Sequence, residues 1–163
     1  MDQRNTEAVS LAKALSVKNR LAGRLSQARS NIETYNSVLA GQSDERATVD
    51  VRAEYERLLT LQEGLVAVKA AIQRANAPVY EDVLRLGEKK ALVQMLAGLN
   101  TKHGTEPGFN GVEYRYSATI TKPEVLEMVR RLEAEIDKLQ DKLNQYNATT
   151  RVEVPQAVLD LAR

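Results

Sequence analysis

The chain contains no cysteine and no tryptophan, and it has a single histidine among its 163 residues. Without cysteine it cannot form a disulfide, use a thiol as a nucleophile or bind a metal through sulfur. Six tyrosines and one phenylalanine are its only aromatic residues, whereas a large globular core normally uses more of them. We therefore expect thin helical layers rather than one thick core.

A charge excess of either sign is also missing, because 23 Lys and Arg side chains balance 22 Asp and Glu side chains. Proteins that bind nucleic acid usually carry a basic excess, so we expect no nucleic-acid partner. No apolar run approaches the roughly 18 residues of a membrane-spanning helix. The opening segment MDQRNTEAVS lacks the basic and apolar regions of a signal peptide. We therefore expect no membrane partner, and a location in the cytoplasm or within a viral particle.

What the sequence does contain is long stretches in which apolar residues recur at alternating intervals of three and four. This spacing is the a/d pattern of coiled coils and predicts helices. Segments rich in glycine, proline or asparagine, such as NTKHGTEPGFNG, separate these stretches. The sequence predicts one helical domain over 1–154, with helices at about 6–40, 49–75, 79–99 and 122–147, strands at about 112–120 and 151–154, and a tail of one or two frayed turns at 155–163.

The arrangement of these elements follows from their connections. A short polar segment containing Gly41 joins the first two helices, so we expect them to form an antiparallel hairpin. The third helix has apolar residues on more than one face, which indicates neighbours on both sides. The fourth helix begins at a capping box formed by Thr121 and Glu124. The predicted fold class is therefore mainly α, an elongated antiparallel helical hairpin or bundle with coiled-coil character and a minor β element.

The strand predicted over 112–120 raises the question of its partner. Apolar and polar residues alternate through VEYRYSATI, which is typical of a half-buried strand, and its backbone groups must be hydrogen-bonded. The other candidate strand, 151–154, lies at the far end of a helix about 40 Å long. We therefore predict that residues 112–120 pair across a subunit boundary and that the heptad seam of the last helix joins the same contact. The predicted oligomer interface consists of Tyr114, Tyr116, Ile120, Val129, Leu132, Ile136, Leu139, Leu143 and Tyr146.

Three blocks of the chain resemble the septicolysin-like family of bacterial helical proteins. They are LAKALSVKNRLAGRLSQAR, LVAVKAAIQRANAPV and YRYSATITKPEVLEMVRRLEAEIDKLQDKLNQYNATTRVEV, which together cover most of residues 8–154. Asn76, the segment 147–150 and the strand carry the specific part of the resemblance. Ala148 departs from the family pattern, in which tryptophan follows the terminal asparagine. The resemblance implies a helical fold, and the family name implies a cytolysin.

Each candidate catalytic, anion-binding or metal-binding site also has a simpler interpretation, as an ordinary loop or surface residue. His103 could act as a general base, but no nucleophile or orienting acid accompanies it, so an ordinary loop residue is the favoured interpretation. The segment HGTEPGFNG could hold an anion on its backbone N–H groups, yet it matches no phosphate-binding fingerprint and is interpreted as a connecting loop. The carboxylates Glu133, Asp137 and Asp141 fall on the solvent side of the heptad, where they predict no metal site.

These observations favour a non-enzymatic, self-assembling structural or scaffolding protein that needs no cofactor. Its expected partners are copies of itself, as a dimer or a ring, with other subunits of a larger particle left open. The rival interpretation is a septicolysin-like cytolysin or membrane-active toxin, since an amphipathic hairpin can insert into a membrane after unfolding. An enzyme would need a convergent polar pocket, which the sequence does not indicate.

Overall fold

The computed structural model describes residues 5–37 and 49–163 and is mainly helical with a minor β element, as the sequence predicts. The chain divides into two compact units, each of which is described by itself. The first unit comprises Met1–Pro78 and Tyr146–Arg163, and the second comprises Val79–Gln145. The first unit is therefore discontinuous in the sequence, and the second unit is inserted into it.

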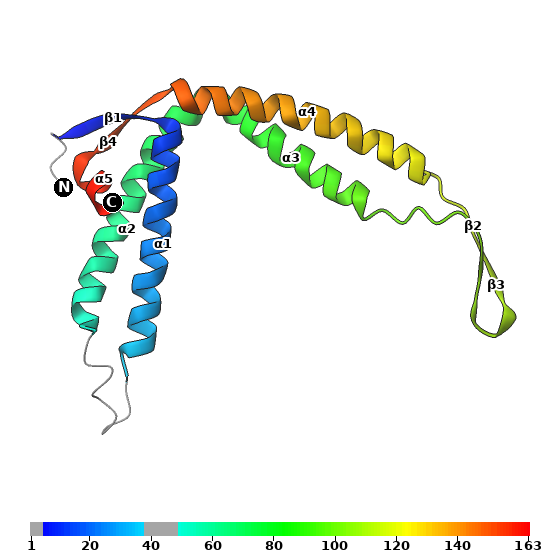
Figure 1. Cartoon of the computed structure of the whole chain (residues 1–163), viewed down its shortest axis with the longest axis horizontal. Helices are drawn as coiled ribbons and strands as arrows, with labels where there is room; N and C mark the ends of the chain where they lie inside the picture. Colours follow the sequence, from blue (N-terminus) through cyan, green and yellow to red (C-terminus); the bar gives the residue numbers. More distant parts are fainter. Residues whose placement is uncertain (1–4, 38–48) are drawn as a thin grey trace. The chain divides into compact units, whose positions relative to one another are not determined.

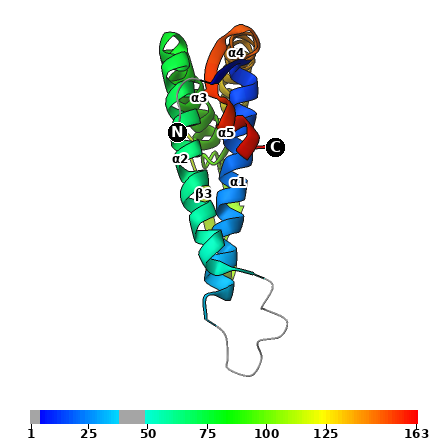
Figure 2. The same cartoon turned by 90° about the vertical axis from the view of Figure 1, so that its left-hand side faces the viewer.

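Two long helices form the frame of the first unit. Helix α1 (Leu11–Tyr35) and helix α2 (Val51–Asn76) run antiparallel and side by side (Figure 1 and Figure 2), which confirms the expected hairpin. The Ser10 hydroxyl accepts the Lys13 N–H at the start of α1, and the Asp50 carboxylate accepts two N–H groups at the start of α2. These caps satisfy backbone donors that have no partner within a helix. The first helix was expected to reach residue 40, but it ends at Tyr35 and residues 36 and 37 are not helical, while residues 38–40 lie outside the described residues.

A two-stranded antiparallel sheet joins distant parts of the first unit. Strand β1 (Thr6–Ser10) pairs with strand β4 (Arg151–Pro155), and Val9 lies opposite Val152. The expectation that the first helix begins at residue 6 is wrong, because extended backbone at Ser10 ends the strand and starts the helix at Leu11. Pairing with β1 also supplies β4 with a partner inside the chain. The sheet does not need a second subunit to satisfy its backbone.

The segment after β4 belongs to the core of the first unit. Helix α5 (Gln156–Leu161) packs against α2, and Val154 and Val158 are fully buried. The Arg24 guanidinium on α1 donates to the Leu161 carbonyl oxygen at 2.7 Å and holds the end of α5 in place. The prediction of a frayed tail over 155–163 is therefore wrong, because a six-residue helix that is too short to be stable alone is stabilised by burial against α1 and α2.

The second unit is built on two helices that lie side by side (Figure 1). A short 3₁₀ turn, η1 (Ala77–Val79), leads into helix α3 (Tyr80–Ala97). Helix α4 (Lys122–Thr149) is the other helix of the pair, and its last turn, from Tyr146, belongs to the first unit. At the start of α4, the Thr121 N–H donates to Glu124 Oε2 at 2.7 Å, and the Thr121 hydroxyl donates to the same oxygen. The predicted capping contact between these two residues is confirmed.

A β-hairpin connects α3 and α4. Strand β2 (Gly104–Pro107) pairs antiparallel with strand β3 (Glu113–Tyr116), and the 3₁₀ turn η2 (Phe109–Gly111) lies between them. Strand β3 therefore has a partner within its own chain, which removes the reason for which pairing across a subunit boundary was predicted. Gly104 and Gly111 adopt positive φ angles of 103° and 76°, which glycine tolerates best, so the preceding loop segment folds back on the strand. The strand is also shorter than predicted, because residues 117–120 are not paired.

Candidate functional site

The heptad positions of α4 that were predicted as an oligomer interface lie on one face of the helix. Leu143 is buried, and Val129, Leu132, Ile136 and Leu139 are half-buried. Glu135 and Lys142, on the same stretch of α4, form ion pairs with side chains of α3. These ion pairs place this face of α4 beside α3. Much of the predicted seam is therefore covered by the chain's own helix.

The other predicted interface residues separate into two environments. Tyr146 belongs to the first unit, where its hydroxyl donates to the Ala75 carbonyl oxygen at 2.8 Å. Tyr114 on β3 is exposed, and Ile120 lies exposed beyond the end of that strand. Tyr116 is half-buried, and the Lys102 ammonium lies 5.0 Å from the centre of its ring, a cation–π contact. The structure thus does not bring the nine predicted residues together on one surface.

The contact between α3 and α4 contains charged residues at positions that a helical pair normally fills with apolar ones. Asp82 pairs with Lys142 at 2.6 Å, Lys89 pairs with Glu135, and Lys90 donates to Gln140 at 3.3 Å. Lys90 is exposed, whereas Asp82 and Lys89 belong to an inner stripe of α3 with intervals of three and four, whose members are all buried or half-buried. The inner stripe consists of Val79, Asp82, Leu86, Lys89, Val93 and Leu96. Polar residues at such positions fix the register of a helical pair while lowering its stability.

A second apolar stripe runs along the opposite side of α3. Its members are spaced at intervals of four, three, four and four, and the structure leaves every one of them exposed. The outer stripe consists of Tyr80, Leu84, Gly87, Ala91 and Met95. The sequence indicated apolar residues on more than one face of this helix, but it did not show which of them the chain itself would cover.

Ion pairs on the surface of the second unit shift the pKa values of several side chains. A hydrogen bond from Lys89, together with its positive charge, lowers the pKa of Glu135. Hydrogen bonds from Arg131 and Arg130 lower the pKa of Glu127, whose carboxylate lies 2.9 Å from the Arg131 guanidinium. These groups are exposed, so such pairs contribute little to stability.

The residues considered for catalysis or anion binding make hydrogen bonds within the second unit. His103 Nδ1 accepts the Ala118 N–H at 3.3 Å, next to the β2–β3 hairpin. The Gly108 N–H donates to the Val112 carbonyl oxygen at 2.6 Å within the hairpin turn, so that donor does not point towards a ligand. Both hydrogen bonds help to hold the β2–β3 hairpin and the segment next to it in their conformation.

The carboxylates considered for metal binding are exposed on α4. Glu133, Asp137 and Asp141 all lie on the solvent side, as the heptad register predicts. Within residues 5–37 and 49–163, no group of three or more His, Asp or Glu side chains is arranged to hold a metal ion. The same described residues include no helix that is long and apolar enough to cross a membrane.

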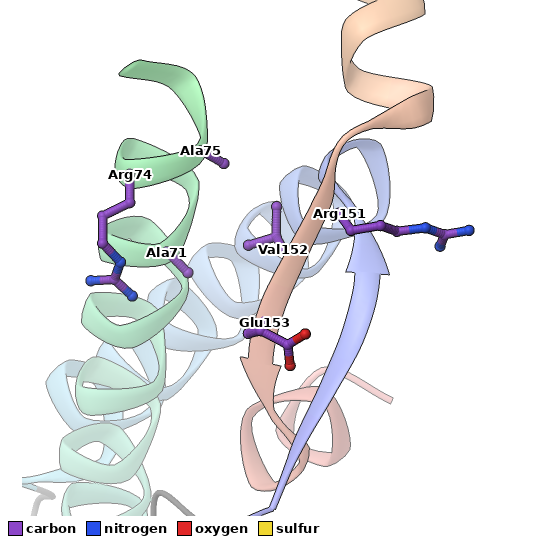
Figure 3. Close-up of a pocket in the computed structure, with 6 residues that line it drawn as sticks. All are labelled: Ala71, Arg74, Ala75, Arg151, Val152 and Glu153. Carbon is purple, nitrogen blue, oxygen red and sulfur yellow. The ribbon is translucent and has the colours of Figure 1, made fainter. Parts of the chain in front are cut away.

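A cavity of about 330 Å³ lies in the first unit between the end of α2 and β4 (Figure 3). Val152 points towards Ala71 and Ala75 across the cavity, whereas the Arg151 side chain points away from α2 (Figure 3). The Glu153 carboxylate is engaged by the Thr6 hydroxyl at 2.8 Å. The cavity therefore offers an apolar wall with few converging polar groups, unlike a typical ligand site.

Comparison with known proteins adds no assignment: no family model, curated protein or solved structure matches the chain. The resemblance to the septicolysin-like family accordingly remains an expectation from the sequence. The chemical character of the surface is then the best guide to function, and the most unusual surface is the one that the second unit exposes.

Proposed function

We propose that this protein is a non-enzymatic structural or scaffolding subunit that assembles with copies of itself. The observation that carries the proposal is the uneven distribution of apolar side chains between the two units. Among the exposed large apolar side chains of the described residues, only Tyr55, Leu59 and Val66 belong to the first unit. All the others lie on the second unit, in α3, in the β2–β3 hairpin and near the start of α4.

The second unit also buries little. The large core cluster belongs to the first unit, whereas the buried apolar residues of the second unit are Val79, Leu96, Val125 and Leu143. A pair of helices with so small a core gains little stability from burial, and charged residues occupy part of its inner stripe. Contact with another molecule would remove the exposed apolar surface from water and stabilise the unit.

Copies of the same chain are the partners that this proposal requires. The charges of the chain are balanced, so two copies do not repel each other through their net charge. A symmetric dimer or a closed ring would bury the same surface on each copy. The proposal includes the cytoplasm or the interior of a viral particle as the location, and it requires no cofactor.

Sedimentation equilibrium of the wild-type protein tests the proposal directly. We expect the average mass to rise with concentration and to exceed that of one chain in the micromolar range. The Tyr114→Ser and Met95→Ser variants, which change exposed residues of the second unit, should each fold normally by circular dichroism. A wild-type protein that remains monomeric at micromolar concentration would overturn the proposal.

A septicolysin-like cytolysin is the second candidate. It is favoured by Phe109, which is 84% exposed in the turn between β2 and β3, because an exposed aromatic ring can enter a lipid interface. Glu106 and Glu113 lie on the strands beside that turn and oppose binding to anionic lipids. Release of a trapped dye from neutral liposomes that is lost in Phe109→Ser would support the cytolysin, and intact liposomes would exclude it.

A further inference from the structure

The outer stripe of α3 has the geometry of a helix-packing face. At about 100° per residue, it lies on roughly the opposite side of α3 from the inner stripe. Tyr80 is 47% exposed, Leu84 is 51% exposed and Met95 is 53% exposed, although each carries a large apolar side chain. A helix that is apolar on two opposite sides is normally covered on both, and within the described residues only the inner side has a neighbour.

Gly87 lies at the centre of the outer stripe. A glycine inside a helix lowers the stability of that helix relative to alanine. A Cβ atom at Gly87 would meet no atom within 4 Å, so no contact among the described residues requires glycine there. Ala91 lies one turn further along the same stripe. Two small residues in succession let the backbone of a second helix approach closely at this point.

The order of side chains along the outer stripe suits an identical, antiparallel copy of α3. Tyr80 and Met95 lie at equal distances from a point between Gly87 and Glu88, and so do Leu84 and Ala91. A two-fold axis through that point would place the large Leu84 against the small Ala91 of the other copy. It would also place the Tyr80 ring against the Met95 sulfur, a favourable pairing. A two-fold contact must be self-complementary in this way.

We propose that the outer stripe of α3 is the contact between two copies of this chain, packed antiparallel about Gly87. This inference rests on the proposed function, because it names the surface through which self-assembly begins. A single helix pair buries less than the roughly 800 Å² per partner of a standard interface. We therefore expect the α3 contact to form a weak dimer rather than a permanent one.

Disulfide cross-linking is a sharp test, because the natural chain has no cysteine. Leu84→Cys and Ala91→Cys are prepared separately, with tags of different mass, and are oxidised alone and as a mixture. The antiparallel contact predicts a mixed disulfide between the two variants and little disulfide in either variant alone. Gly87→Cys should cross-link to itself, whereas Asp137→Cys, on the exposed side of α4, should not. Self-cross-linking of Leu84→Cys and Ala91→Cys without the mixed product would overturn the antiparallel contact.

A matched pair of glycine variants tests the surface without cysteine. Gly87→Arg should raise the dimer dissociation constant at least tenfold, which sedimentation equilibrium measures. Gly23→Arg is the control, because Gly23 is also an exposed helical glycine whose Cβ would meet no atom within 4 Å. Circular dichroism should show that both variants keep their helices. An equal effect of both variants would overturn the assignment to the outer stripe.

The outcomes separate this inference from the proposed function. An oligomeric protein that gives no cross-link at Gly87→Cys would overturn the α3 contact and leave self-assembly standing. A monomeric protein would overturn both. Binding of the monomer to liposomes that is lost in Gly87→Arg would assign the outer stripe to a lipid surface and would also overturn the contact between copies.

Discussion

Arg24 on α1 donates from Nη1 to the main-chain carbonyl oxygen of Leu161, the last residue of α5, at 2.7 Å. A charged donor on a carbonyl oxygen near a helix end is a favourable contact, because it offsets the partial negative charge there. We expect Arg24→Ala to destabilise the protein by about 1–2 kcal/mol. Backbone amides of α5 should exchange faster with deuterium. The control is Arg29→Ala, which removes an exposed charge from the same helix and should leave α5 protected.

The core of the first unit should be sensitive to the loss of single side chains. Leu61 on α2 is 1% exposed, whereas Leu59, two residues earlier on the same helix, is 39% exposed. We expect Leu61→Ala to lower the free energy of unfolding by about 2–5 kcal/mol, because it leaves a cavity. Leu59→Ala should cost less than about 1 kcal/mol. Urea denaturation followed by circular dichroism measures both, and equal effects would contradict the described packing.

The start of α4 should respond to pH through Glu124. Hydrogen bonds from the backbone N–H and the hydroxyl of Thr121 lower the pKa of this carboxyl from its ordinary value of 4.5. Because the folded pKa is lower than the unfolded one, Glu124 stabilises the fold above the unfolded pKa, and this contribution is lost as pH falls through the folded pKa. Titration of the Glu124 carboxyl carbon by NMR should therefore show a midpoint below 4.5.

The two hydrogen bonds at Glu124 can be separated with one substitution. Thr121→Val removes the hydroxyl donor and keeps the N–H donor. The midpoint of Glu124 in this variant should lie between that of the wild type and the ordinary value. A midpoint in the wild type at or above the ordinary value would show that the capping contact does not form in solution.

The β2–β3 hairpin should depend on the absence of a side chain at Gly108. A Cβ atom there would lie 2.7 Å from the Val112 carbonyl oxygen and 2.6 Å from Cδ2 of Tyr114, and neither neighbour leaves room for it. We expect Gly108→Ala to open the turn and to speed proteolytic cleavage within residues 104–116, without changing the helix content. Gly98→Ala is the control, because its Cβ would make only ordinary contacts at 3.7 Å. Unchanged resistance of Gly108→Ala to protease would contradict this packing.

The sequence was most informative where the pattern was local and long. Alternating intervals of three and four placed all four long helices, and their observed ends mostly lie within about two residues of the predicted ones, apart from the start of α1 and the end at Tyr35. The same pattern was less reliable for individual positions. At the start of α1, Val17 is buried three residues after Ala14, whereas Lys18, four residues after Ala14, is only half-buried. Burial depends on the helix across the contact, which periodicity alone does not describe.

Short and non-local elements were beyond the reach of the pattern. Strand β1 has only one buried residue, Val9, and its partner β4 lies at the other end of the chain. Strand β2 ends at Pro107 inside a glycine-rich segment, whose composition is typical of a loop. For the candidate site, the heptad rule found the face of α4 that α3 covers. The outer stripe of α3 became apparent only when the covered side of that helix was known.

The discontinuity of the first unit has a consequence for the order in which the protein folds during synthesis. Helices α1 and α2 leave the ribosome early, but Val152, Val154 and Val158, which complete their core, follow only after the whole second unit. Because synthesis proceeds at about 5–20 residues per second, the apolar side of the nascent α1–α2 hairpin stays exposed for several seconds before these residues are made. All residues of the second unit are synthesised before residues 146–163, which the first unit needs. The second unit therefore completes its fold first, although its synthesis begins later. The first unit closes last, when β4 reaches β1.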